Sequence, residues 1–254
     1  MQSLREIRRR AHAWLSLARS EIGPTVLVLF LAGFILVFRH LAEEVGEGDT
    51  RAFDRAIIYA LRTPGDPHRP IGPDWLNTAA LDFTALGSVT VLTLFIVLVC
   101  GLCLSLRHWR EALFLLVAAG GGLFLTDLLK DLFQRDRPPQ ILHAAAAAGT
   151  SFPSGHATLS TTVFLTFGVL IAHFSKRKRV RIYALTAAVI LALGVGCTRV
   201  YLGVHWPTDV LAGWCVGSAW ALIWWGVAIG WERATHRRLV VVEPPLERPA
   251  EDGA

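Results

Sequence analysis

Three short segments of the sequence combine cationic side chains, histidines and a carboxylate, and each lies at the end of a long apolar run. In chain order, their polar residues are Lys130 and Arg137, then Ser154, Gly155 and His156, and finally Arg199, His205 and Asp209. Arginine offers a planar fork of donors that suits phosphate oxygens, whereas lysine offers a point charge. The three cations, Lys130, Arg137 and Arg199, are therefore expected to surround a multiply charged anion.

Ser154 and Gly155 come directly before an apolar run that is long enough to form a helix. Backbone N–H groups at a helix N-terminus, together with the helix dipole, bind anions. Gly155 has no Cβ, so the backbone can approach a ligand closely at this position. We therefore expect Ser154 and Gly155 to form a phosphate-binding cap on the helix that follows.

The two histidines divide the chemistry between a nucleophile and an acid. His205 lies four residues before Asp209, and a carboxylate beside an imidazole fixes its tautomer and raises its basicity. The free ring nitrogen of His205 can then attack phosphorus. We expect His156 to protonate the departing oxygen, while the three cations stabilise the equatorial oxygens of the transferring group. Because these cations already supply the positive charge, the arrangement requires no metal ion and no other cofactor.

The elements that must position these residues are membrane helices. Of the 254 residues, 53% are hydrophobic and only 18% are charged, whereas about 25% charge is usual for a soluble chain. Six apolar runs approach the roughly 20 residues that cross a bilayer, at about 24–42, 84–106, 112–129, 157–174, 182–198 and 210–231. The sequence therefore predicts an all-α, polytopic membrane protein with about six transmembrane helices.

The basic residues predict which side of the membrane each connection faces. Lysines and arginines cluster before the first run, between the second and third, between the fourth and fifth, and after the sixth, and the positive-inside rule makes these regions cytoplasmic. The same rule accounts for the net charge of +5, so no nucleic-acid partner is expected. We predict a cytoplasmic basic N-terminus at 1–23, a six-helix domain at 24–231 and a cytoplasmic, disordered tail at 232–254. The three polar segments then face the exterior of a bacterial inner membrane.

The remaining connections and the cysteines carry weaker signals. The connection at 43–83 is acidic, its part at 53–62 has the spacing of a surface-lying helix, and prolines and glycines predict that 63–75 is irregular. The alanine-rich segment at 139–152 is expected to form a short helix or a mobile flap that, with 43–83, shapes access for a lipid headgroup. No disulfide framework is inferred, because all four cysteines lie in apolar runs: Cys100, Cys103, Cys197 and Cys215.

The three polar segments resemble the motifs of the type-2 phosphatidic acid phosphatase superfamily, which includes lipid phosphate phosphatases and vanadium haloperoxidases. The family patterns K-x6-R-P, P-S-G-H and S-R-x5-H-x3-D stand here as Lys130…Arg137-Pro138, Pro153-Ser154-Gly155-His156 and Thr198-Arg199…His205…Asp209. The one departure is Thr198, where the family usually has serine, and threonine keeps the hydroxyl. The motifs cover residues 130–209, and the pattern of helices extends the resemblance to about 20–231.

The resemblance implies an integral membrane enzyme that hydrolyses a phosphomonoester or diphosphate of a membrane lipid through a phosphohistidine on His205. It implies His156 as the acid, and as phosphate ligands it implies Lys130, Arg137, Ser154, Gly155 and Arg199. Bacterial members act on undecaprenyl diphosphate, phosphatidylglycerophosphate, phosphatidate or lipid A. Undecaprenyl diphosphate is the substrate favoured here, and a lipid A phosphatase or a lipid phosphotransferase are alternatives within the family.

Three other classes of protein are weaker alternatives. An ion or anion transporter would place charges in the middle of its helices, whereas these cations and histidines lie at helix ends. The haloperoxidases are soluble, unlike a chain with about six spans. A zinc hydrolase could use His143, His156 and His205, but the nearby cations would repel a metal and no H-x-x-H spacing is present.

Overall fold

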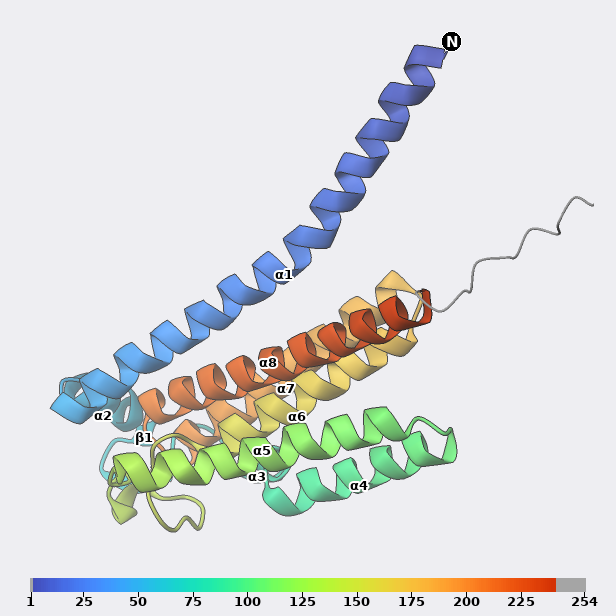
Figure 1. The fold of residues 1–254 in the computed structure, drawn as a ribbon. Coiled ribbons are helices and arrows are strands. Elements are labelled where there is room, and N and C mark those ends of the chain that lie inside the picture. The colour runs from blue at the N-terminus through green and yellow to red at the C-terminus, as the bar shows by residue number, and fades with distance from the viewer. Residues whose placement is uncertain (1, 241–254) are drawn as a thin grey trace, which may run out of the picture.

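The computed structural model describes the backbone of residues 2–240 and the side chains of residues 23–231, and this part of the chain is predominantly helical (Figure 1). Its helices are α1 Gln2–Glu47, α2 Arg51–Ala60, α3 Asp74–Ala85, α4 Val89–Ser105, α5 Trp109–Phe133, the 3-10 helix η1 Gln140–Leu142, α6 Gly155–Phe174, α7 Lys178–Tyr201 and α8 Pro207–Val240. Two short strands, β1 Arg62–Thr63 and β2 Asp66–Pro70, pair antiparallel. The predicted all-α class is confirmed.

Five helices in the described part of the chain are long and apolar enough to cross a membrane: Gly23–Glu47 within α1, the whole of α5, α6 and α7, and Pro207–Trp231 within α8. The pair α3 and α4 gives a sixth span if it is counted as one, although the two helices are bent by 49° relative to each other. Large apolar side chains such as Phe124 and Ile190 are exposed on these helices, as suits contact with lipid. The prediction of about six spans is confirmed.

The span expected at about 84–106 is present as α4, but the chain breaks between α3 and α4 within its first residues. Ser88 caps α4 by accepting a hydrogen bond from the backbone N–H of Val91 at 3.3 Å. Gly87 lies in the break, where a Cβ would stand 2.4 Å from a side-chain carbon of Val195 and 3.3 Å from the carbonyl oxygen of His156. The break therefore allows a close approach to α7 and to the start of α6.

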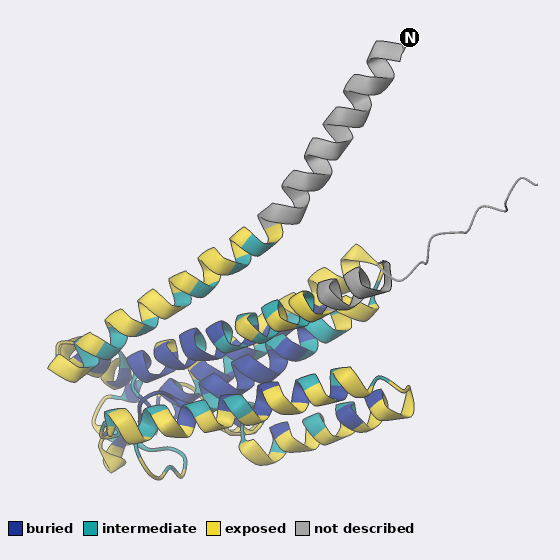
Figure 2. Cartoon of the chain, viewed as in Figure 1, coloured by how far each residue is buried: buried dark blue, intermediate teal, exposed yellow. Residues whose placement is uncertain are grey.

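Helix α6 forms the centre of the bundle and packs against α5, α7 and α8. Figure 2 shows that the buried residues concentrate in this central part of the bundle. Small residues permit the close packing, since a Cβ on Gly213 of α8 would lie 2.9 Å from the carbonyl oxygen of Ser154. The buried hydroxyl of Thr158 donates to the same carbonyl at 3.0 Å, so α6 satisfies this hydroxyl within its own first turn. The beginning of α6 is thereby held closely against α8.

Two helices extend beyond the predicted spans. Helix α1 runs from Gln2 to Glu47, so the expected first span at 24–42 lies inside a longer element, and the part that contains this span lies along α8 (Figure 1). Helix α8 continues to Val240, which is nine residues past the expected end at 231. Residues 241–254, which make up most of the predicted disordered tail, lie outside the described residues.

The connection at 43–83 folds into α2, the β1–β2 hairpin and α3. The helix expected at 53–62 is present as α2, and its buried residues are Asp54 and Ile58. The segment expected to be irregular at 63–75 instead contains the hairpin, because Gly65 at a φ of +84° permits the tight turn between the strands. The buried Arg62 donates hydrogen bonds to the carbonyls of Leu142 and Tyr201, and so ties this hairpin to the two other connections at the same end.

The alanine-rich segment at 139–152 contains one 3-10 turn, η1, but residues 144–148 are not helical, so the short-helix alternative is wrong for the alanine run itself. Tertiary hydrogen bonds replace those of a helix. The N–H of Ala144 donates to the carbonyl of Leu202 at 2.9 Å, and the carbonyl of Ala148 accepts from Arg137 at 2.8 Å. These hydrogen bonds hold the segment against Leu202 and Arg137.

Candidate active site

The residues singled out in the three polar segments meet at one end of the helix bundle. Lys130 lies in the last turn of α5, and Arg137 lies in the connection after it. Ser154 to His156 lie at the start of α6, and Arg199 lies in the last turn of α7. His205 lies in the connection between α7 and α8, and Asp209 lies in the first turn of α8. The charged groups of Lys130, Arg137, Arg199 and His205 all lie within electrostatic range of His156. The structure therefore brings together the residues that the sequence pattern grouped.

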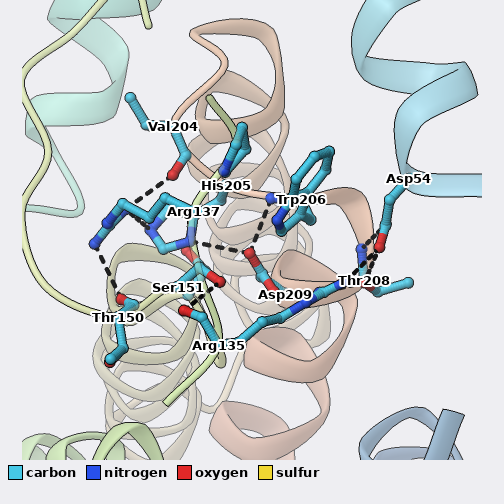
Figure 3. A network of polar contacts seen from close by, with 12 residues as sticks. Asp54, Arg135, Arg137, Thr150, Ser151, Val204, His205, Trp206, Thr208 and Asp209 are labelled. Atoms are coloured by element: carbon cyan, nitrogen blue, oxygen red, sulfur yellow. Dashed lines mark hydrogen bonds and ion pairs between the residues drawn. The ribbon is translucent and has the colours of Figure 1, made fainter. Parts of the chain in front are cut away.

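A contact with Arg137 assigns the tautomer of His205. His205 is only 2% exposed, and its Nε2 lies 3.1 Å from Nη1 of Arg137 (Figure 3). A guanidinium can only donate, so Nε2 must accept, and the ring proton is assigned to Nδ1. Nδ1 faces Oδ2 of Asp209 at 3.5 Å. The lone pair that could attack phosphorus is therefore on Nε2.

Asp209 is fully buried and divides its oxygens among several partners. Oδ2 accepts the backbone N–H of Trp206 at 2.9 Å and also faces His205, while Oδ1 accepts from Nη1 of Arg135 at 2.6 Å. The backbone carbonyl of Asp209 accepts the N–H of Ser154 at 3.0 Å. Asp209 thus links the first turn of α8 to both the imidazole and the beginning of α6.

Burial keeps the imidazole of His205 neutral. It lowers the pKa of His205 from 6.5 to about 4, although the nearby carboxylate of Asp209 acts in the opposite direction, and the charges of Arg137 and Arg199 lower the pKa further. A neutral ring is the form that can act as a nucleophile. The imidazole of His205 is therefore uncharged at neutral pH.

Arg137 also organises the alanine-rich segment. Its guanidinium donates to four backbone carbonyls, those of Ala148 at 2.8 Å, Gly149 at 2.9 Å, Thr150 at 3.2 Å and Val204 at 2.8 Å. Burial lowers the pKa of Arg137, with the charge of Asp209 opposing this, but arginine stays protonated in proteins. A single cation therefore fixes both the loop at 148–150 and the imidazole of His205.

The start of α6 presents donors that an anion could use. Ser154 is fully buried, and its Oγ has no hydrogen-bond partner among the described side chains and backbone. Lys130 places its Nζ 3.4 Å from the position of a Cβ on Gly155. The N–H groups of a first helical turn also lack partners within their helix. A buried donor without a partner is costly, and a phosphate oxygen would satisfy it.

Arg199 approaches the site from α7. It is 5% exposed, its Nη1 donates to the hydroxyl of Thr84 at 3.0 Å, and its Nε has no partner within the described part of the chain. The neighbouring Thr198, where the family usually has serine, donates its hydroxyl to the carbonyl of Val195 at 2.6 Å. This hydroxyl therefore bonds to its own helix, which a serine at this position could do equally well.

Sequence reasoning missed four residues around the site: Thr84, Arg135, Asp54 and Thr208. Arg135 had one usable signal, because it is a cation inside the first motif on the side of the membrane where positive charge is not expected. Asp54 and Thr84 come from distant parts of the chain with no motif around them. Only the fold shows that they touch the site.

The described residues contain no group of three His, Cys, Asp or Glu side chains arranged to hold a metal ion. His143, considered above as a zinc ligand, places its Nε2 2.8 Å from the carbonyl oxygen of Pro138, and a carbonyl can only accept. Burial lowers the pKa of His143.

Comparison with known proteins agrees with this arrangement. Residues 111–232 match the PAP2 superfamily. The chain is 31% identical over 189 residues to phosphatidylglycerophosphatase B of Bacillus subtilis, covering 72% of this chain and 86% of that protein. It is 41% identical over 68 residues to an undecaprenyl-diphosphatase of Sulfolobus acidocaldarius, covering 27% of this chain and 29% of that protein. The crystal structure of a transmembrane PAP2-type phosphatidylglycerolphosphate phosphatase from Bacillus subtilis matches 79% of this chain and 96% of its own, with a TM-score of 0.71 and 28% identity.

Proposed function

This chain belongs to the PAP2 superfamily, and on that premise we propose that it removes a phosphate group from a membrane lipid through a phosphohistidine on His205. The observation that carries the proposal is the 3.1 Å contact between Nη1 of Arg137 and Nε2 of His205, because it puts the ring proton on Nδ1 and leaves Nε2 unprotonated. In the resting protein the Nε2 lone pair accepts the Arg137 N–H, which must turn away when Nε2 attacks phosphorus. Asp209 behind Nδ1 stabilises the positive charge that the ring acquires when Nε2 is phosphorylated.

The reaction has two steps. In the first, Nε2 of His205 forms a bond to phosphorus while the bond from phosphorus to the leaving oxygen breaks, and His156 donates its proton to that oxygen. In the second, water attacks phosphorus, the N–P bond breaks, and His156 takes a proton from the water. Inorganic phosphate leaves, and both histidines return to their starting states.

The phosphoryl oxygens are bound by the donors that surround His205. Lys130, Arg137 and Arg199 supply positive charge, and the partnerless Oγ of Ser154 and Nε of Arg199 are directed hydrogen-bond donors. Gly155 lies at the N-terminus of α6, where the helix dipole favours an anion. These groups stabilise charge on the transferring group without a metal ion.

The orientation in the membrane follows from the basic residues. We place the N- and C-termini in the cytoplasm and the active site at the outer boundary of a bacterial inner membrane, because the basic clusters flank the opposite ends of the helices. A cysteine introduced at Ala146 should react with a membrane-impermeant thiol reagent added outside intact cells. Reaction only after the membrane is opened would reverse this orientation.

Two lipid classes are the leading substrates. A polyprenyl diphosphate such as undecaprenyl diphosphate is favoured by the family resemblance and by the 41% identical relative, although that match spans only 68 residues. Phosphatidylglycerophosphate is favoured by the relative and the crystal structure that share the larger part of this chain, at 72% and 79%. Both lipids present a terminal phosphate on a membrane anchor, which is the chemistry that the site fits.

The test is phosphate release by the purified full-length protein in detergent with EDTA present. The lipids are undecaprenyl diphosphate, phosphatidylglycerophosphate, phosphatidate and lipid A, beside His205→Ala and the exposed-site control His68→Ala. We expect release from at least one lipid by the wild type and His68→Ala, and none by His205→Ala. Release that survives in His205→Ala would overturn the nucleophile, and release abolished by EDTA would overturn the metal-independent mechanism.

A further inference from the structure

Arg135 lies between two buried carboxylates that come from distant parts of the chain. Its Nη1 donates to Oδ1 of Asp209 at 2.6 Å and to the hydroxyl of Thr208 at 2.8 Å, and its Nη2 donates to Oδ2 of Asp54 at 2.7 Å (Figure 3). Asp54 and Asp209 are both fully buried. Asp54 belongs to α2 and Asp209 to α8, so the guanidinium bridges the first long connection to the first turn of the last helix.

We propose that Arg135 and Asp54 are positioning residues for His205, which act through Asp209 and set the protonation of the imidazole. The inference rests on the proposed role of His205 as the nucleophile. Arg135 lies inside the first motif but outside its defining positions, and α2 contains no motif. Both would then have a role in positioning His205.

The geometry around Asp209 shows how Arg135 acts. The short bond of 2.6 Å to Arg135 holds Oδ1, while Oδ2 is bound by the N–H of Trp206 and stays 3.5 Å from Nδ1 of His205. A carboxylate that moved into a short hydrogen bond with Nδ1–H would favour the imidazolium, which has no lone pair to attack with. Arg135 therefore keeps Asp209 near enough to orient the imidazole of His205, but too far from Nδ1 to stabilise the imidazolium.

Asp54 determines how strongly Arg135 acts on Asp209. Its Oδ2 shares the guanidinium, and it also accepts from the hydroxyl of Thr208 at 2.8 Å, while its Oδ1 accepts the backbone N–H of Thr208 at 3.0 Å. The guanidinium is therefore divided between two carboxylates. Without the charge of Asp54, the whole positive charge would act on Asp209 and, through it, on His205.

The charged and titratable groups that face His205 come from every element packed around it. They are Asp209 from α8, Arg137 from the connection after α5, Arg199 from α7 and His156 from α6. Substitution of Arg135 or Asp54 removes none of these four groups. A change in the titration of His205 in either variant therefore reports on the buried network.

The two substitutions should shift the titration of His205 in opposite directions. Arg135→Gln removes a positive charge and frees Asp209, so the imidazolium becomes more stable and the midpoint rises by roughly one unit. Asp54→Asn removes a negative charge and lets Arg135 act fully on Asp209, so the midpoint falls. A purely structural role would weaken folding in both variants without producing opposite shifts.

The experiment follows the His205 imidazole by NMR in the full-length, 15N-histidine-labelled protein in detergent, with the signal assigned by its loss in His205→Ala. Controls are Arg55→Gln on the exposed face of α2 and Asp82→Asn on the exposed face of α3, which should leave the midpoint unchanged. Shifts in the same direction, or no shift in either variant, would overturn the proposal. Should Arg135→Gln fail to fold, Arg135→Lys keeps the charge and should retain the wild-type midpoint, while Asp54→Asn should still lower it.

Activity distinguishes this proposal from the proposed function. If His205→Ala retains phosphatase activity, the nucleophile is wrong whatever the titrations show. If His205→Ala is inactive but the two midpoints do not separate, the function stands and the role of Arg135 falls. With both correct, Arg135→Gln should lower kcat/KM at neutral pH by about 10- to 100-fold because Asp209 no longer orients the ring, a loss like that seen when the partner of a metal-binding histidine is removed.

Discussion

Nη1 of Arg137 lies 3.1 Å from Nε2 of His205, and this contact assigns the ring proton to the opposite nitrogen, where Asp209 faces it. The residue that directs the nucleophile is thus also one of the three cations proposed to bind phosphate. In the proposed mechanism, attack and charge stabilisation therefore depend on one guanidinium, which four backbone carbonyls hold in place.

Arg137→Lys should lower kcat/KM by about 10²- to 10³-fold, the cost of removing one donor from a site of developing charge. Lysine keeps the charge but lacks the planar fork that reaches Nε2 and the surrounding carbonyls together. Steady-state phosphate release measures the effect, with Arg55→Lys on the exposed face of α2 as the control. Wild-type kcat/KM in Arg137→Lys would show that the fork has no role.

Ser154→Ala should reduce activity without reducing stability. The buried Oγ of Ser154 has no protein partner among the described residues, so its removal breaks no bond in the resting protein. A hydrogen bond to a charged phosphate is worth about 1.5–3 kcal/mol, so kcat/KM should fall by roughly 10- to 100-fold. The measurements are kinetics and thermal unfolding in detergent.

The matched control for Ser154→Ala is Ser160→Ala on the same helix, where the hydroxyl donates to the carbonyl of Ala157 at 3.3 Å. That variant should lose some stability, about 1 kcal/mol, and keep its kcat/KM. The opposite pattern in the two variants would mean that Ser154 is a structural residue and not a phosphate ligand.

Gly213→Ala should destabilise the site through helix packing. The added Cβ would stand 2.9 Å from both the carbonyl oxygen of Ser154 and the Cβ of Ala157, so α8 and α6 would have to separate. Overpacking of this kind costs about 1–3 kcal/mol of unfolding free energy. Gly230→Ala on the same helix meets nothing within 4 Å and should leave the melting temperature and activity unchanged. Equal melting temperatures for both variants would contradict the close packing.

The titration of His205 should make folding stability depend on pH. Its folded-state pKa of about 4 lies below the ordinary 6.5, so between these values the unfolded chain binds more protons than the folded chain. Stability contributed by neutral His205 is therefore complete above about pH 6.5 and is lost as the pH falls toward 4. Melting temperatures of the wild type should fall more steeply over this range than those of His205→Gln. Parallel curves would show that His205 is not held neutral by burial.

The sequence predicted which polar residues lie together because these residues are tied to short motifs at helix ends. Lys130, Ser154 and His205 each lie at the end of an apolar run, and the ends of membrane helices meet at one side of the bilayer. Local spacing alone then placed His205 one helical turn from Asp209. These relationships depend on few residues and need no knowledge of how the helices pack.

Features that depend on tertiary contacts could not be predicted. The run at 84–106 is largely apolar, and the break at Gly87, where the chain comes close to Val195, is seen only in the fold. Asp54 has the sequence context of an ordinary exposed helix residue, yet it is fully buried against Arg135. The alanines at 144–148 have high helix propensity, but hydrogen bonds to Arg137 and Leu202 override it.

The most direct test of the account is to trap the phosphorylated enzyme. The full-length protein is mixed with a 32P-labelled lipid phosphate that it hydrolyses, quenched within one turnover and digested, and the labelled peptide is sequenced. The account predicts a base-stable, acid-labile label on the peptide that contains His205, and no label in His205→Ala. A label on another residue, or rapid turnover with no labelled protein at any time, would contradict it.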